Sequence, residues 1–131
     1  MSEDTKKILV VDDDIDLLEQ VKAVLEANGY QVMSAESEKE AEQLLEKERP
    51  ALAVLDLMME NQDSGFVLSY KIKKKDPTIP VIIVTAVTSQ TGIHFDTSGP
   101  NEQSWIKADA ILEKDIRYEQ LLGEIKRLLK E

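Results

Sequence analysis

The chain has 131 residues, of which 42% are hydrophobic and 32% charged, so it can bury a core and is not expected to be disordered. Its formal net charge of −10 disfavours direct binding to nucleic acids and anionic membranes, and no apolar run is long enough to cross a bilayer. It has no cysteine, which excludes disulfides, thiolate catalysis and cysteine-based zinc sites. We therefore expect one cytoplasmic domain over residues 1–131, with no second domain fused to it.

The first half of the chain alternates short aliphatic runs with amphipathic stretches. Residues 8–11 form a continuous aliphatic run, as in a central parallel strand that is covered on both faces. A stripe of apolar residues at helical spacing follows over residues 17–25. Residues 30–35 predict a second strand, and a second helix over residues 38–49 ends before a proline.

Two of these helices begin with capping signals. Asp14 or Asp16 is well placed to cap the first helix, because a carboxylate there can accept hydrogen bonds from free backbone N–H groups. Ser37 and Glu40 have the spacing of a capping box, which predicts the start of the second helix.

The second half repeats the alternation. Residues 51–57 predict a third strand, and residues 65–75 a helix whose three terminal lysines complement the helix dipole. Residues 81–84 are strongly β-branched and predict a fourth strand, whereas residues 109–112 give a weaker fifth. The last helix, over residues 118–129, has the clearest helical periodicity.

Strands that alternate with helices at this spacing predict right-handed crossovers and an α/β fold with one doubly wound parallel sheet. Residues 86–107 fit this pattern poorly, since they lack sustained periodicity and contain two glycines and a proline. We expect a long excursion there with little regular helix.

Polar side chains stand where the predicted strands end. Asp12 and Asp13 follow the first strand, and Asp56 closes the third. Thr85 follows the fourth strand and Lys114 the fifth. Because an open parallel sheet binds ligands outside the carboxyl ends of its strands, we expect these five side chains to converge.

Converging carboxylates raise one another's pKa and destabilise a fold unless a cation joins them. Mg²⁺ prefers oxygen ligands, retains waters and commonly uses one or two carboxylates plus a phosphate oxygen. Asp13 and Asp56 suit direct ligation, Asp12 could act through a water, and the backbone carbonyl of Met58 could complete the protein ligands.

A metal-bound carboxylate at this edge can also be a nucleophile, because aspartate can form an acyl phosphate. The transition state of phosphoryl transfer spreads negative charge over the moving oxygens, which a cation, an ammonium and a hydroxyl can stabilise. Mg²⁺, Lys114 and Thr85 would supply that set.

With these motifs the sequence resembles a response-regulator receiver domain of two-component signalling over nearly its whole length. The matching stretches are VVDDD after the first strand, VLDLMMENQDSG around Asp56, IVTA at Thr85 and LEK at Lys114. The resemblance implies five parallel strands in the flavodoxin-like order 2-1-3-4-5, with helices on both faces. It also implies that Asp12 and Asp13 are the acidic metal site, Thr85 the switch hydroxyl and Lys114 the phosphate-pairing lysine.

The activity implied by the resemblance is Mg²⁺-dependent transfer of a phosphoryl group to Asp56. The donor is a phosphohistidine of a histidine kinase or of a histidine phosphotransfer protein, and the phosphorylated form signals by binding another protein. Such a receiver catalyses its own phosphorylation and slow dephosphorylation and is not otherwise an enzyme.

Several positions depart from the family pattern. Glu60 and Asp115 stand where the family usually has proline, and Ser64 intrudes between Asp63 and Gly65. Ile111 occupies the position of an aromatic switch residue, so coupling of Thr85 to an aromatic rotamer is expected to be absent or altered.

Met58 and Val87 occupy the positions that flank the attacking water in this family, and both are apolar here. Poor orientation of that water predicts a long-lived acyl phosphate.

Two other functions fit parts of the pattern. One is a degenerate receiver that serves only as a binding module. The other is a small phosphohydrolase of the haloacid-dehalogenase type, in which Asp12 and Asp14 would form the catalytic pair, although the chain lacks a cap domain and a later acidic pair.

Overall fold

A computed structural model describes residues 6–57, 64–85, 109–113 and 117–130 of the chain. A five-stranded parallel sheet with strand order β2-β1-β3-β4-β5 forms its centre. The strands are β1 (Lys7–Val11), β2 (Gln31–Ala35), β3 (Leu52–Asp56), β4 (Val81–Thr85) and β5 (Ala110–Glu113). The helices are α1 (Ile15–Ala27), α2 (Glu38–Lys47), α3 (Ser64–Lys75) and α5 (Tyr118–Leu129). The predicted fold class and strand order are thus confirmed.

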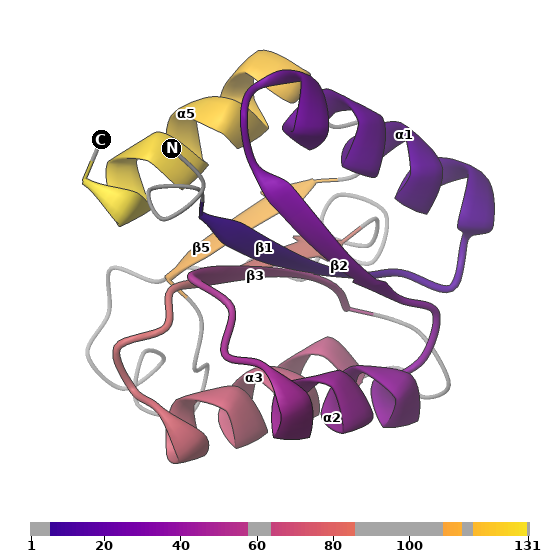
Figure 1. The fold of residues 1–131 in the computed structure, drawn as a ribbon, viewed down its shortest axis with the longest axis vertical. Coiled ribbons are helices and arrows are strands. Elements are labelled where there is room, and N and C mark those ends of the chain that lie inside the picture. Colours follow the sequence, from indigo (N-terminus) through magenta and orange to yellow (C-terminus); the bar gives the residue numbers. More distant parts are fainter. Residues whose placement is uncertain (1–5, 58–63, 86–108, 114–116, 131) are drawn as a thin grey trace, which may run out of the picture.

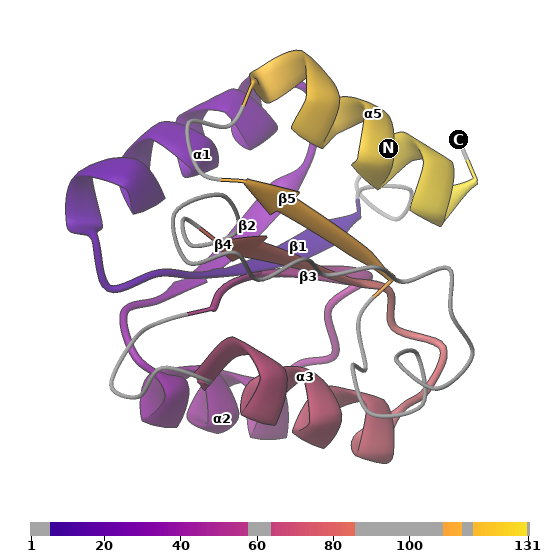
Figure 2. The same cartoon turned by 180° about the vertical axis from the view of Figure 1, so that it is seen from behind.

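The sheet lies between two layers of helices, with α1 and α5 on one face and α2 and α3 on the other (Figures 1 and 2). Side chains alternate along each strand, so β1 directs Ile8 and Val10 to the first face and Leu9 and Val11 to the second. All four are almost inaccessible to solvent. Burial on both faces explains why the central strands are continuous aliphatic runs.

The capping signals are largely confirmed. Asp14 is the N-cap of α1, and its carboxylate accepts a hydrogen bond from the N–H of Leu17 at 3.2 Å. Ser37 caps α2 and accepts from the N–H of Glu40 at 3.1 Å. The Glu40 carboxylate accepts from the N–H of Glu36 at 2.6 Å, one residue before the donor that a capping box predicts.

Lysines at the end of α3 make tertiary contacts in addition to their place near the negative end of the helix dipole. Lys75 donates a hydrogen bond to the backbone carbonyl of Leu45 in α2 at 2.9 Å. Lys73 donates to the carboxylate of Asp109, just before β5, at 2.6 Å. These contacts tie α3 both to its neighbouring helix and to the start of the edge strand.

No helix within the described part of the chain is long and apolar enough to cross a membrane. The expected irregular excursion over residues 86–107 lies outside the described residues and stays a prediction, as does the expectation of a single domain.

Candidate functional site

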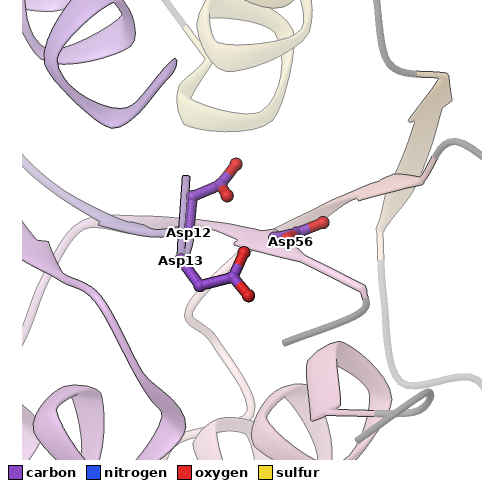
Figure 3. A group of neighbouring side chains, drawn as sticks. All are labelled: Asp12, Asp13 and Asp56. Carbon is purple, nitrogen blue, oxygen red and sulfur yellow. The ribbon is translucent and has the colours of Figure 1, made fainter. Parts of the chain in front are cut away.

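Three carboxylates meet at the carboxyl edge of the sheet (Figure 3). Asp12 and Asp13 come directly after β1, and Asp56 is the last residue of β3. The two strands are paired in parallel with Val11 opposite Leu55, so their ends lie side by side. One carboxylate oxygen from each aspartate lies within 4.8 Å of the other two. The expected convergence of these three side chains is therefore observed.

The three aspartates differ in their surroundings. Asp12 and Asp56 are only 6% and 3% exposed, whereas Asp13 is exposed to solvent. The Asp12 carboxylate accepts a hydrogen bond from the N–H of Asp14 at 2.9 Å, which fixes the turn between β1 and α1. Oδ2 of Asp56 is buried and accepts no hydrogen bond from the described part of the chain, although Asp56 takes part in other interactions. Two buried carboxylates this close need a compensating positive charge.

The donor set fits a hard divalent cation. Carboxylate oxygens are the protein ligands that such ions prefer, and a small octahedral ion needs only part of its shell from the protein. The buried Asp12 and Asp56 would provide fixed ligands, and the exposed Asp13 would leave the site open to solvent on one side. Met58, whose backbone carbonyl was expected to complete the shell, lies outside the described residues.

Thr85 ends the strand next to β3. Asp56 lies opposite Val84 in the register of β3 and β4, so Thr85 stands one residue further toward the same edge. It is almost completely buried, with 1% of its surface exposed. Across β4, Thr85 lies opposite Glu113 of β5. Lys114 follows Glu113 directly in the sequence but lies outside the described residues.

Gly65 is a part of the site that the sequence reasoning did not recognise. Its N–H donates a hydrogen bond to the carbonyl of Leu57 at 2.8 Å. A Cβ at this position would lie 2.7 Å from the carbonyl oxygen of Asp56 and 2.7 Å from Cα of Leu57. The first turn of α3 therefore packs directly on the backbone that carries Asp56. A glycine at the start of a helix just after a strand-end aspartate was the available signal.

The structure describes two of the four residues that depart from the family pattern. Ser64 is completely buried and begins α3, so it is accommodated inside the fold. Ile111 is partly buried and packs against the core on the face covered by α2 and α3. Glu60 and Asp115 lie outside the described residues.

Comparison with known proteins bears on this arrangement. A family model described as the response regulator receiver domain matches residues 8–126. The chain belongs to this receiver family. It is similar to the response regulator MprA of Mycolicibacterium vanbaalenii, with 32% identity over 124 residues that make up 95% of this chain and 50% of MprA.

Solved receiver structures share the fold. A CheY-like receiver domain protein from Methanospirillum hungatei is 29% identical with a TM-score of 0.80, covering 96% of this chain and 94% of that one. TrrA from Thermotoga maritima, solved in complex with Mg²⁺-BeF, is 26% identical with a TM-score of 0.77, covering 95% and 99%. This receiver spans between 19% and 50% of the length of four curated relatives that it matches.

The haloacid-dehalogenase-like alternative finds no support in the geometry. It requires Asp12 and Asp14 to act as a pair, but the Asp14 carboxylate caps α1 by accepting from Leu17. The carboxylate partners of Asp12 in the three-residue cluster are Asp13 and Asp56.

Proposed function

We propose that this receiver accepts a phosphoryl group on Asp56 from a phosphohistidine of a histidine kinase or histidine phosphotransfer protein. The reaction requires Mg²⁺ held by Asp12, Asp13 and Asp56, with Met58 adding a backbone carbonyl. The observation that carries this proposal is the cluster of three carboxylates within 4.8 Å at the end of a central strand. Membership in the receiver family supports it.

Asp56 is the best nucleophile among the three. It is itself the last residue of β3 and is paired with Val84 of β4, whereas Asp12 and Asp13 lie beyond the end of β1. The Asp12 carboxylate is engaged by the N–H of Asp14, and Asp13 lies exposed in a turn. A nucleophile must keep its geometry while the donor approaches, which favours Asp56.

In the transfer step a carboxylate oxygen of Asp56 attacks phosphorus and forms a new P–O bond. The P–N bond of the phosphohistidine breaks, and its electron pair stays with the imidazole of the donor. Bound Mg²⁺ supplies positive charge that offsets the aspartates and the phosphoryl oxygens. The hydroxyl of Thr85 and the ammonium of Lys114 bind phosphoryl oxygens, which stabilises the charge that develops there.

Mg²⁺ is the preferred ion for two reasons. The site offers few protein ligands and one open side, which suits an ion that retains water and binds a phosphate oxygen. In addition, the similar receiver TrrA was solved with Mg²⁺-BeF.

The signal leaves the domain through phosphorylation-dependent binding of another protein. Direct contact with nucleic acid is disfavoured by the net charge of −10. A cytoplasmic location is part of the same proposal, because the phosphohistidine donors of two-component systems act there.

The test is incubation of the protein with Mg²⁺ and acetyl phosphate, followed by intact-mass measurement. We expect one added phosphoryl group, which chelation of Mg²⁺ prevents. Asp56→Asn should abolish the reaction, while Asp16→Asn, which removes an exposed acid of the first turn of α1, should leave it intact. An unmodified wild-type protein would refute phosphoryl transfer, and an accompanying failure to bind Mg²⁺ would favour the degenerate binding module.

A further inference from the structure

We propose that Asp109 is a positioning residue for phosphoryl transfer. Its carboxylate fixes the register of β5 against β4, and β5 leads directly in the sequence to Lys114, the proposed phosphate-binding lysine. This inference rests on the proposed function of Asp56. It adds to that function a residue at the opposite end of the sheet from the carboxylates.

Asp109 lies just before β5 and joins three elements of the fold. Its N–H donates a hydrogen bond to the carbonyl of Val81 at 2.8 Å, and its Oδ2 accepts from the N–H of Val81 at 2.8 Å. The same Oδ2 accepts from Nζ of Lys73 in α3 at 2.6 Å. One residue therefore holds both backbone groups of the first residue of β4.

The Val81 contact is more important than the ion pair. Val81 is completely buried, so its N–H cannot form a hydrogen bond to water if the Asp109 carboxylate is removed. The side chains of Lys73 and Asp109 are 17% and 35% exposed, and an ion pair that solvent can reach contributes little. The position of β5 therefore depends on an oxygen that accepts the hydrogen bond from the Val81 N–H, and not on the negative charge of Asp109.

β5 needs such a restraint because its own sequence fixes the register weakly. It has four residues, and it pairs on one side only, with β4. Ala110 and Leu112 face the α1–α5 side and Ile111 faces the other, so the apolar pattern consists of three side chains. A short edge strand with so little pattern is prone to slip.

A slip would reach the candidate site. In the observed register Glu113 lies opposite Thr85, and Lys114 is the next residue. A shift of one residue moves the strand by about 3.3 Å, which exceeds the tolerance of a hydrogen bond to a phosphoryl oxygen. The carboxylates of Asp12 and Asp56 stand on β1 and β3, so metal binding does not depend on β5.

The experiment compares Asp109→Ala, Asp109→Asn and Lys73→Met with the wild type in three measurements. These are the rate of phosphorylation by acetyl phosphate, the Kd for Mg²⁺, and hydrogen exchange of the β5 amides. We expect Asp109→Ala to slow phosphorylation about tenfold. Its Kd for Mg²⁺ should stay within about twofold of the wild-type value. Its β5 amides should exchange faster.

Asp109→Asn keeps an oxygen acceptor for Val81 and should restore most of the rate and the amide protection. Lys73→Met removes only the ion pair and should resemble the wild type. If circular dichroism shows that Asp109→Ala does not fold, Asp109→Glu replaces it, because this variant keeps the charge but displaces the acceptor. We then expect phosphorylation to be slower in Asp109→Glu than in Asp109→Asn.

The inference is overturned if Asp109→Ala keeps the wild-type phosphorylation rate and the wild-type protection of the β5 amides. It is also overturned if Asp109→Asn is as impaired as Asp109→Ala, or if the Mg²⁺ affinity of Asp109→Ala falls in parallel with its phosphorylation rate. A wild-type protein that takes up no phosphoryl group would refute the proposed function instead. Amide exchange of β5 would still decide whether Asp109 holds the register.

Discussion

Gly65 and Asp56 are in backbone contact: a Cβ on Gly65 would lie 2.7 Å from the Asp56 carbonyl oxygen. The neighbouring Cα of Leu57 would be equally close. Both atoms belong to the backbone at the end of β3, so no side chain can rotate away to make room. The position of the proposed phosphoacceptor therefore depends on the absence of a single methyl group from α3.

Gly65→Ala is expected to destabilise the fold by about 1–3 kcal/mol, because the added methyl forces α3 away from β3. Displacement of the Asp56 backbone should also slow phosphorylation by acetyl phosphate. Urea unfolding and the phosphorylation rate measure the two effects. Gly123→Ala is the matched control, since Gly123 lies in α5 with nothing within 4 Å of an added Cβ.

Alanine has the higher helix propensity, so Gly123→Ala should stabilise the protein by about 0.5–1 kcal/mol. Equal effects of the two substitutions would show that the close contact at Gly65 has no energetic weight.

Asp13→Asn should have opposite effects with and without Mg²⁺. Without the ion it removes repulsion from Asp12 and Asp56 and should stabilise the fold by about 0.2–1 kcal/mol. Mg²⁺ at a hundred times its Kd should stabilise the wild type by about 2.7 kcal/mol, and most of that gain should be lost in the variant. Thermal unfolding with and without Mg²⁺ measures both. Asp16→Asn carries the same charge change outside the cluster and should keep the full Mg²⁺ effect.

Asp76 should contribute a pH-dependent part of the stability. Hydrogen bonds from the Thr78 hydroxyl, then from Arg49 and the Thr78 N–H, lower the pKa of Asp76 from 3.8 to about 2. Because the folded-state pKa is the lower one, this contribution is complete above about pH 4 and is lost as the pH falls toward 2. The stability difference between wild type and Asp76→Asn should therefore shrink over that interval, as urea unfolding at several pH values can measure.

The cause of this shift can be tested with two variants. Thr78→Val removes the hydroxyl that lowers the pKa most, whereas Arg49→Met removes the second contribution. NMR titration of the Asp76 carboxyl should give a higher pKa in Thr78→Val than in Arg49→Met. The reverse order would mean that the guanidinium charge dominates at this partly exposed site.

The acyl phosphate should be long-lived, because the side chains of Met58 and Val87 are apolar and offer no polar group to orient the attacking water. Met58→Asn should shorten its lifetime severalfold by adding a group that hydrogen-bonds this water. The decay of phosphorylated protein after removal of acetyl phosphate, followed by intact mass, gives the rate. An unchanged decay rate in Met58→Asn would remove the reason for the prediction.

The sequence was sufficient for the fold class and for the convergence of Asp12, Asp13 and Asp56. Aliphatic runs and helical stripes are local patterns, and they indicate where each strand ends. Parallel strands share one carboxyl edge, so residues at strand ends meet there without further information.

Other features were decided by the tertiary structure. The sequence left Asp14 and Asp16 as alternative caps, and the turn after β1 selects Asp14. It also placed Gly65 only in a motif and at the start of a helix, and Asp109 only at the start of the fifth strand. Their roles come from contacts with Asp56 and Val81, which are remote in the chain. Close backbone approach and strand register depend on how distant segments are placed relative to one another, and no local pattern of residues carries that information.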